Sequence, residues 1–158
     1  MTNHNSKQAD FVFSQVVSAY LRKAGWSPTR VVPTSVYERA YENEHLRFVV
    51  EVKEFLRHFG GLIIKYKMPT KVPDVLEFEA EHAVRGMGRG ALRSFEELTK
   101  ASALFPIGHY QGGTCMLLMD EGGKVFGGSD TCVCLIGRTG SEAVETILTG
   151  SRVTVLDE

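Results

Sequence analysis

Apolar residues recur at helical spacing in the stretch 50–60, and a strand pattern follows at once. The apolar positions repeat at i, i+3, i+4 and i+7, which is one face of a helix: Val52, Phe55, Leu56 and Phe59. We expect Gly60 to end this helix in the left-handed conformation that glycine adopts at low cost. The run 62–68 then predicts a strand. This helix–glycine–strand segment is therefore expected at the centre of the fold.

Two more helices are predicted before this segment. Apolar residues keep helical spacing over 13–24, where Gly25 ends the helix and Trp26 is expected to fold back over it. The residues from Ser35 to Glu38 have the form of a capping box, in which two side chains accept hydrogen bonds from backbone N–H groups at a helix start. We therefore expect a second helix to begin at Ser35.

Strict alternation marks the stretch 75–81 as a strand with two unlike faces. The three apolar residues share one face and the three carboxylates share the other: Leu76, Phe78 and Ala80 against Glu77, Glu79 and Glu81. Neighbouring carboxylates on such a face lie roughly 6 to 7 Å apart. The apolar set is expected to face the core.

The remaining pattern is a meander of short strands closed by a helix. Strands are predicted over 105–108 (edge-like), 114–120 (buried), 124–128 and 131–136. Capping boxes at Ser94 and Thr139 predict a short helix to about residue 103 and a last helix that Gly150 ends, while 83–92 is the least regular stretch. Helices first, an antiparallel meander second and a closing helix last indicate an α+β fold. We expect one domain, with an antiparallel or mixed central sheet on which the N-terminal helices and a C-terminal helix pack.

Charge and composition narrow the classes of partner. The chain of 158 residues has 18 basic and 19 acidic residues, a formal net charge of −1, so no long-range positive field would hold nucleic acid. The longest apolar run, 115–119, is far shorter than the roughly 20 residues that span a bilayer. Residues 1–10 form a polar tail without the apolar region of a secretory signal, and three cysteines cannot all pair. We therefore expect a cytoplasmic protein without a nucleic-acid or membrane partner.

Candidate catalytic and metal-binding residues lack the spacing that their chemistry needs. Cys132 and Cys134 are one residue apart, whereas structural zinc sites use a wider gap and a second ligand pair, so we expect these thiols to pack in the core. The five histidines form no zinc motif. The glycines of 86–90 lack the spacing and the Lys-Ser/Thr pair of phosphate loops and are expected to form a flexible loop. The sequence thus predicts no catalytic residue, no metal and no cofactor.

A set of motifs runs in order from about residue 17 to 150. Most of its members are apolar or glycine positions that build a scaffold: Leu21 to Trp26, Thr34, Val52 to Leu62, Phe105 to Gly108, Gly112, Gly113, Leu118 to Glu121, Gly123 to Phe126, Gly137, Glu142 to Leu148, and Gly150. In order and spacing this set resembles the SUKH superfamily of bacterial immunity proteins, specifically its third group, although the stretch 68–92 departs from the pattern. The resemblance implies a single SUKH-like α+β domain over 11–158 without catalytic residues. It also implies a partner, a cognate secreted toxin domain, which the protein binds and neutralises inside the producing cell.

Two other classes of function stay open. Eukaryotic members of the superfamily look like signalling and cell-wall scaffolds, so a protein-binding adaptor or regulator of the same fold is the first alternative. A small metal- or thiol-dependent enzyme, which would use the cysteines or the 86–90 glycines, is the second. A toxin gene beside this one would favour immunity, and an isolated gene would favour regulation.

The acidic face is the candidate partner surface. Glu77, Glu79 and Glu81 would form a negative stripe that steers a basic toxin, whereas the simpler interpretation is a solvated strand face. Tyr110 and Asp130, predicted near hairpin ends, are expected to extend the same surface.

Overall fold

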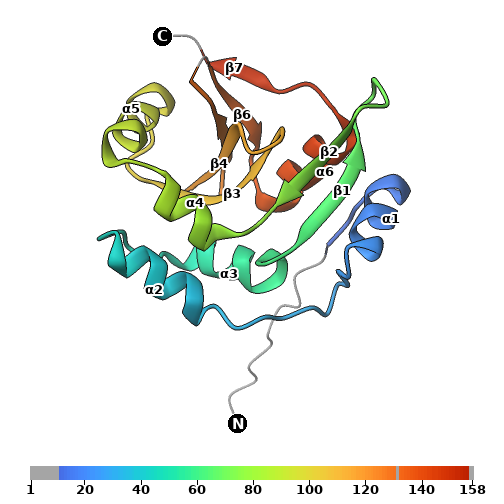
Figure 1. The fold of residues 1–158 in the computed structure, drawn as a ribbon, viewed down its shortest axis with the longest axis horizontal. Coiled ribbons are helices and arrows are strands. Elements are labelled where there is room, and N and C mark those ends of the chain that lie inside the picture. Colours follow the sequence, from blue (N-terminus) through green and yellow to red (C-terminus); the bar gives the residue numbers. More distant parts are fainter. Residues whose placement is uncertain (1–10, 131, 157–158) are drawn as a thin grey trace.

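One antiparallel sheet forms the centre of the structure, a computed structural model that describes residues 11–130 and 132–156 (Figure 1). The helices there are α1 (Gln15–Lys23), α2 (Ser35–Asn43), α3 (Val50–Phe59), α4 (Ala80–Gly86), α5 (Arg89–Thr99) and α6 (Gly140–Thr149). The strands are β1 (Ile63–Lys67), β2 (Pro73–Glu77), β3 (Leu104–Tyr110), β4 (Cys115–Asp120), β5 (Val125–Gly128), β6 (Val133–Gly137) and β7 (Thr154–Leu156). Each strand pairs antiparallel with the next in the chain, so the predicted α+β class is confirmed. The predicted tail 1–10 lies outside the described residues.

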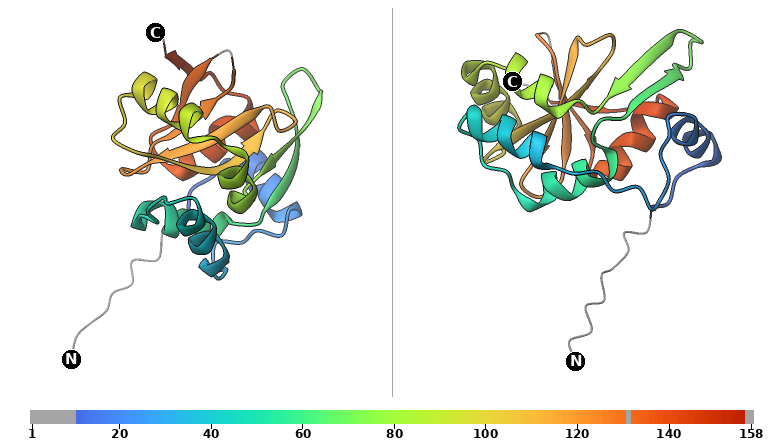
Figure 2. Two further views of the ribbon diagram at one scale, coloured as in Figure 1. Left: turned by 60° about the vertical axis from the view of Figure 1, so that its left-hand side comes forward. Right: turned by 60° about the horizontal axis from the view of Figure 1, so that its bottom comes forward.

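Different helices cover the two faces of the sheet (Figure 2). α1, α3 and α6 pack on one face, here called the core face, and α5 packs on part of the opposite face, here called the outer face. β4 shows why both are needed, since it is apolar on both sides. Its Cys115, Leu117 and Met119 enter the large cluster of the core face, whereas Met116 and Leu118 lie in the small cluster with α5 side chains.

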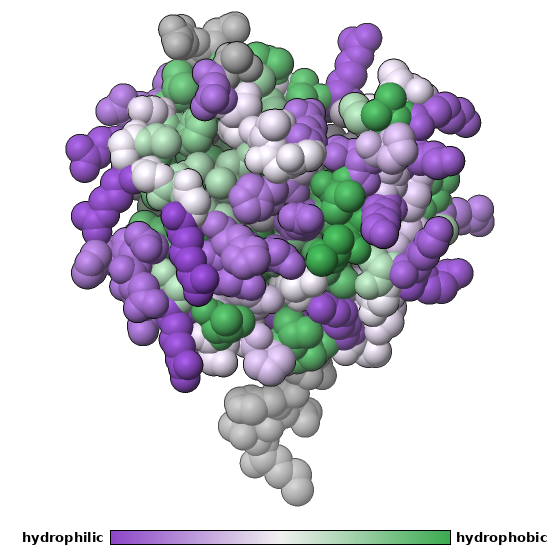
Figure 3. Space-filling model, viewed as in Figure 1, coloured by the Kyte–Doolittle hydropathy of each residue, from purple (hydrophilic) through white to green (hydrophobic). Residues whose placement is uncertain are grey.

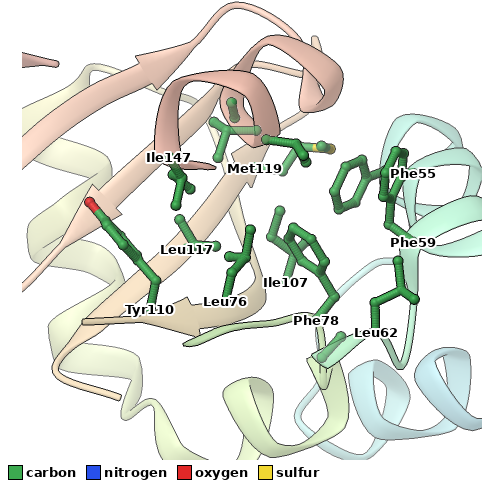
Figure 4. Packing of buried hydrophobic residues seen from close by; sticks show 14 of the residues in the cluster. Phe55, Phe59, Leu62, Leu76, Phe78, Ile107, Tyr110, Leu117, Met119 and Ile147 are labelled. Atoms are coloured by element: carbon green, nitrogen blue, oxygen red, sulfur yellow. The ribbon is translucent and has the colours of Figure 1, made fainter. Parts of the chain in front are cut away.

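Aromatic side chains join α3 to the turn after β2 (Figure 4) and to the turn after α1. Phe55 stacks on Phe59 with ring centroids 4.9 Å apart and meets Phe78 edge-on at 5.0 Å. Trp26 stacks on Phe59 at 5.3 Å. The chain turns back after α1 because the Trp26 N–H donates to the Leu21 carbonyl at 2.9 Å, a common helix-ending pattern. The predicted return of Trp26 over the helix is therefore confirmed.

The end of α3 differs from its prediction by one glycine. Gly60 has φ −55°, so it is not left-handed, and Gly61 takes that conformation with φ +79°. Gly60 is needed for a different reason, which is space. A Cβ there would lie 2.5 Å from the Leu56 carbonyl oxygen and 2.7 Å from the ring and hydroxyl of Tyr37 on α2. The two glycines therefore act separately, one in packing and the other in turning.

One of the three predicted capping boxes is present. The Thr139 hydroxyl accepts a hydrogen bond from the Glu142 N–H at 3.1 Å, so the predicted start of α6 is confirmed, and Gly150 ends that helix with φ +65° as predicted. The predicted box at Ser35 is wrong. Thr34 precedes α2 instead, and its side chain makes no capping hydrogen bond.

The glycine-rich stretch 86–90 belongs to helices and their ends. α4 ends and α5 begins within it, so the predicted flexible loop is wrong. Ser94 consequently lies inside α5, where its Oγ donates to the Gly90 carbonyl at 3.0 Å, and the second predicted capping box is also wrong. Leu92 and Phe95 pack in the outer-face cluster, and this packing outweighs the low helix propensity of glycine.

The predicted strand over 75–81 is wrong beyond Glu77, where β2 ends. The Phe78 N–H still donates to the Leu62 carbonyl at 2.9 Å, but α4 begins at Ala80. Phe78 and Ala80 are buried as predicted, although they reach the core from the turn and from a helix. Glu77, Glu79 and Glu81 therefore do not line one strand.

The meander agrees with its prediction more closely. Strands predicted over 62–68, 114–120 and 124–128 correspond to β1, β4 and β5, and β6 corresponds to 131–136, whose first residue lies outside the described part. The edge-like strand is wrong, because β3 is longer and is the third of seven strands. β7 was not predicted; it is only three residues long and mostly exposed, so no apolar pattern marks it.

We expect Gly60→Ala to lower the free energy of unfolding by about 1–3 kcal/mol, because the new methyl group overlaps Tyr37 and the helix backbone. Gly88→Ala is the matched control, since no atom lies within 4 Å of a Cβ there and its φ is −72°. The control should change the stability by no more than about 0.5 kcal/mol. Urea unfolding of both variants tests this; equal losses would mean that Gly60 is not confined.

Candidate functional site

Cysteine, histidine and carboxylate side chains form no metal- or thiol-based centre within the described residues. No group of three or more of them there is placed to hold a metal ion. Cys115 and Cys134 are buried, and burial raises the pKa of the Cys115 thiol to about 11. Cys132 is exposed, so its predicted core position is wrong. It precedes β6, and the alternation of that strand does not extend to it.

One row of residues crosses the whole sheet on its outer face. The strand register pairs them in order: Ile63, Glu77, His109, Met116, Gly128, Val133 and Leu156. α5 covers the second half, where the Phe95 ring lies so close to Gly128 that a Cβ there would approach it to 2.8 Å.

The first half of this row is accessible. Ile63 is 46% exposed, and Glu77, His109 and Met116 are partly exposed; we call these four residues the open row. In the space-filling view, apolar surface over β1 and β2 lies between charged side chains (Figure 3). Protein–protein interfaces have an apolar centre with a polar rim and are enriched in methionine, so an apolar patch bordered by charged side chains is a surface that a protein partner can cover.

A β-bulge in β3 brings His109 to the open row. The register between β3 and β4 shifts between Pro106 and Gly108, so Ile107 and Tyr110 both face the core while His109 faces outward. Gly108 permits this geometry, because a Cβ there would lie 2.1 Å from the Glu77 carbonyl oxygen of β2. Without the bulge, His109 would share the core face of Ile107.

Carboxylates and imidazoles meet beside the open row. Glu79 precedes α4 and pairs with His82, with 2.8 Å between Oε2 and Nδ1. Burial lowers the pKa of His109, the Glu77 carboxylate opposes that shift, and His82 adds to it. The structure thus brings together two of the predicted acidic residues with two histidines that sequence reasoning did not select.

Glu81 points to a different part of the molecule. It lies in the first turn of α4 and is half-buried, and its Oε2 has no hydrogen-bond partner among the described residues. Burial, and next the Glu81 carboxylate, raises the pKa of Tyr37 on α2. Glu81 therefore lies toward the α2–α4 contact, at the margin of the acidic group.

Tyr110 and Asp130 do not join the open row. Tyr110 is 8% exposed and belongs to the core-face cluster with Cys115 and Cys134. Asp130 is exposed between β5 and β6 and lines a cavity of about 450 Å³ with Phe95 of α5. The expected single surface of five residues is therefore reduced to Glu77 and Glu79, with Glu81 at its margin.

The family comparison covers the fold just described. The sequence model of a family described as SUKH-3 immunity protein matches residues 13–150, from just before α1 to the glycine that ends α6, and so includes the open row. The resemblance based on motifs is confirmed. No curated protein and no solved structure matches the chain. No helix in the described ranges is long and apolar enough to cross a bilayer.

We expect the fold to lose stability as the pH is lowered, partly because of His109. Its folded pKa lies below the usual value of about 6.5, so the imidazole binds its proton more readily in the unfolded chain. This contribution is complete above about pH 6.5 and is lost as the pH falls through the folded pKa. Urea unfolding at neutral pH and near pH 5 should show a smaller loss of stability for His109→Gln than for the unaltered protein.

The control for this experiment is His45→Asn. His45 is exposed with φ +58°, a conformation that asparagine tolerates. Its pH dependence should match that of the unaltered protein. If His109→Gln also retains the full dependence, burial of His109 does not contribute to it.

Proposed function

We propose that this chain, which belongs to the SUKH-3 immunity protein family, binds a cognate secreted toxin domain and neutralises it in the cytoplasm of the cell that makes both. The observation that carries the proposal is the family match over residues 13–150, which includes six helices and six of the seven strands described. The open row supports it as a surface that a protein partner can cover.

Neutralisation by binding makes a demand on affinity. A toxin that escapes its inhibitor acts as a catalyst, so the complex must outlast the toxin's encounters with its target. Low-nanomolar dissociation constants, which correspond to a binding free energy of about −12 kcal/mol, meet this demand. Such complexes commonly bury about 800 Å² on each partner, which is more than the open row alone supplies. We therefore infer that the interface extends from the open row onto α4.

Charge on this surface favours a basic partner. Glu77 and Glu79 lie together beside His109, and within the described ranges no arginine or lysine is in ion-pair contact with either carboxylate. Such a group raises the association rate of a positively charged toxin surface at low salt. The apolar side chains of Ile63 and Met116 beside it supply area that loses water on binding.

A non-catalytic role follows from this proposal, because an immunity protein of this kind acts in stoichiometric amounts. An adaptor or regulator of the same fold is the second candidate, and the open row would serve it equally well as a binding surface. The two differ in partner: a toxin for the first and a signalling or assembly protein for the second.

We expect co-expression with the toxin encoded by the adjacent gene to restore growth of host cells, and the two proteins to co-purify as a complex. The control is co-expression of the same toxin with an unrelated immunity protein, which should not protect. Absence of both rescue and complex formation would contradict the immunity proposal and leave the adaptor as the better candidate.

We expect a Glu77→Gln, Glu79→Gln, Glu81→Gln variant to fold normally, associate with the toxin several-fold more slowly at low salt, and lose most of its salt dependence. The matched control neutralises three exposed carboxylates of α2 or its end: Glu38, Glu42 and Glu44. Association rates measured over a range of salt concentrations compare the two. Equal rates for both variants would assign the acidic group to ordinary solvated surface.

A further inference from the structure

β1 offers an open edge for strand pairing. It is the first strand of the sheet, and only β2 pairs with it within the described residues. The Lys67 N–H points away from β2, because it donates to the Tyr20 hydroxyl of α1 at 3.3 Å. Backbone groups of alternate residues point the same way, so those of Ile63 and Lys65 also point outward. Because the Lys67 N–H is already bound to Tyr20, the outward main-chain groups of Ile63 and Lys65 are those that a further strand can use.

A basic hollow extends from this edge over the β1–β2 hairpin. Its volume is about 650 Å³, and it is lined by residues of α1, β1 and β2 and by one glycine of the β3–β4 turn: Tyr20, Lys23, Lys65, Tyr66, Lys67, Pro73, Asp74, Val75 and Gly112. The three lysines have no carboxylate within ion-pairing distance among the described residues. Tyr20 adds an aromatic wall to the positive charge.

The one carboxylate in the hollow is already engaged. Asp74 on β2 accepts hydrogen bonds from the Tyr66 hydroxyl at 2.7 Å and from the backbone N–H groups of Gln111 and Gly112, each at 3.1 Å. These contacts fix the β3–β4 turn to β2. All these donors are neutral, so Asp74 keeps its negative charge. The three lysines outnumber it, and the hollow remains positive overall.

Charge also decides between possible occupants of the edge. Lysines on an edge strand discourage pairing between copies of the same protein, since two β1 strands side by side would bring Lys65 and Lys67 near their equivalents. A strand that carries carboxylates would instead gain from the same lysines. The lysines therefore disfavour pairing with a like strand and favour pairing with an acidic one.

We propose that the hollow beside β1 binds an acidic, extended segment of a partner protein, which adds to the sheet as a strand. Its backbone pairs with Ile63 and Lys65, and its carboxylates contact Lys23, Lys65 and Lys67. This site does not depend on the toxin proposal, because it lies at the sheet edge and uses positive charge where the open row uses negative charge. Failure of either set of experiments leaves the other intact.

The test uses a labelled synthetic peptide of alternating valine and glutamate, with binding followed by fluorescence anisotropy. Two altered peptides separate the contributions: one replaces glutamate by glutamine, and the other has every backbone amide N-methylated. We expect the acidic peptide to bind and each altered peptide to bind at least about tenfold more weakly, since one lacks charge and the other lacks strand pairing. No binding of the acidic peptide, or equal binding of the N-methylated one, would overturn the proposal.

Protein variants locate the site. Lys65→Glu with Lys67→Glu should weaken binding of the acidic peptide at least about tenfold, whereas Lys53→Glu with Lys124→Glu, two exposed lysines elsewhere, should change it less than about twofold. Thermal melts check that both variants fold. Equal weakening would show non-specific attraction and overturn the site. A concentration-dependent dimer that the first variant abolishes would show that a second copy occupies the edge, which also overturns it.

Discussion

Phe59 at the end of α3 makes the contacts on which the arrangement of the N-terminal elements depends. Its ring stacks on Trp26 at 5.3 Å and on Phe55 at 4.9 Å, and it meets Phe78 at 6.1 Å. Each partner comes from a different local structure: the turn after α1, the helix itself and the turn after β2. Arg30 then holds the helix end by donating to the His58 and Gly60 carbonyls, each at 2.8 Å. Because these rings prefer a few mutual orientations, they fix directions as well as distances, and the helices reach the sheet in one arrangement.

The apolar pattern predicted those features of the fold that depend on periodicity alone. α1, α3, α6 and the strands β1, β4, β5 and β6 follow from the apolar spacing. It did not predict which glycine turns the chain after α3, since Gly60 is confined by Tyr37, a residue of another helix. The same pattern wrongly extended β2 through Glu81. Over so few residues, an apolar residue at every second position fits a continuous strand and a strand followed by a short helix equally well. Both failures arise where packing between separate elements overrides a local pattern.

The candidate site shows the same division. Glu77 and Glu79 were found from sequence because acidic residues stand out beside an apolar strand. His109 was missed because a bulge in β3 reverses the face on which it lies, and the bulge in turn requires the close approach of β2 at Gly108. Tyr110 was assigned to the surface from its place near a turn, yet the same bulge directs its ring into the core. The alternation of apolar and polar residues does not reveal a β-bulge, because the extra residue is not marked by its polarity.

The order of strands in the sheet equals their order in the chain. Every pairing therefore joins segments that are neighbours in sequence, and the largest insertions between paired strands are α4 with α5 and the single helix α6. The entropic cost of closing a loop grows only slowly with its length, and folds built from near neighbours generally reach their native state quickly. The sheet can also grow from β1 onward as the chain leaves the ribosome, since no early strand waits for a distant one. The inhibitor proposed above, which has to be ready before its target is released, would gain directly from such a topology.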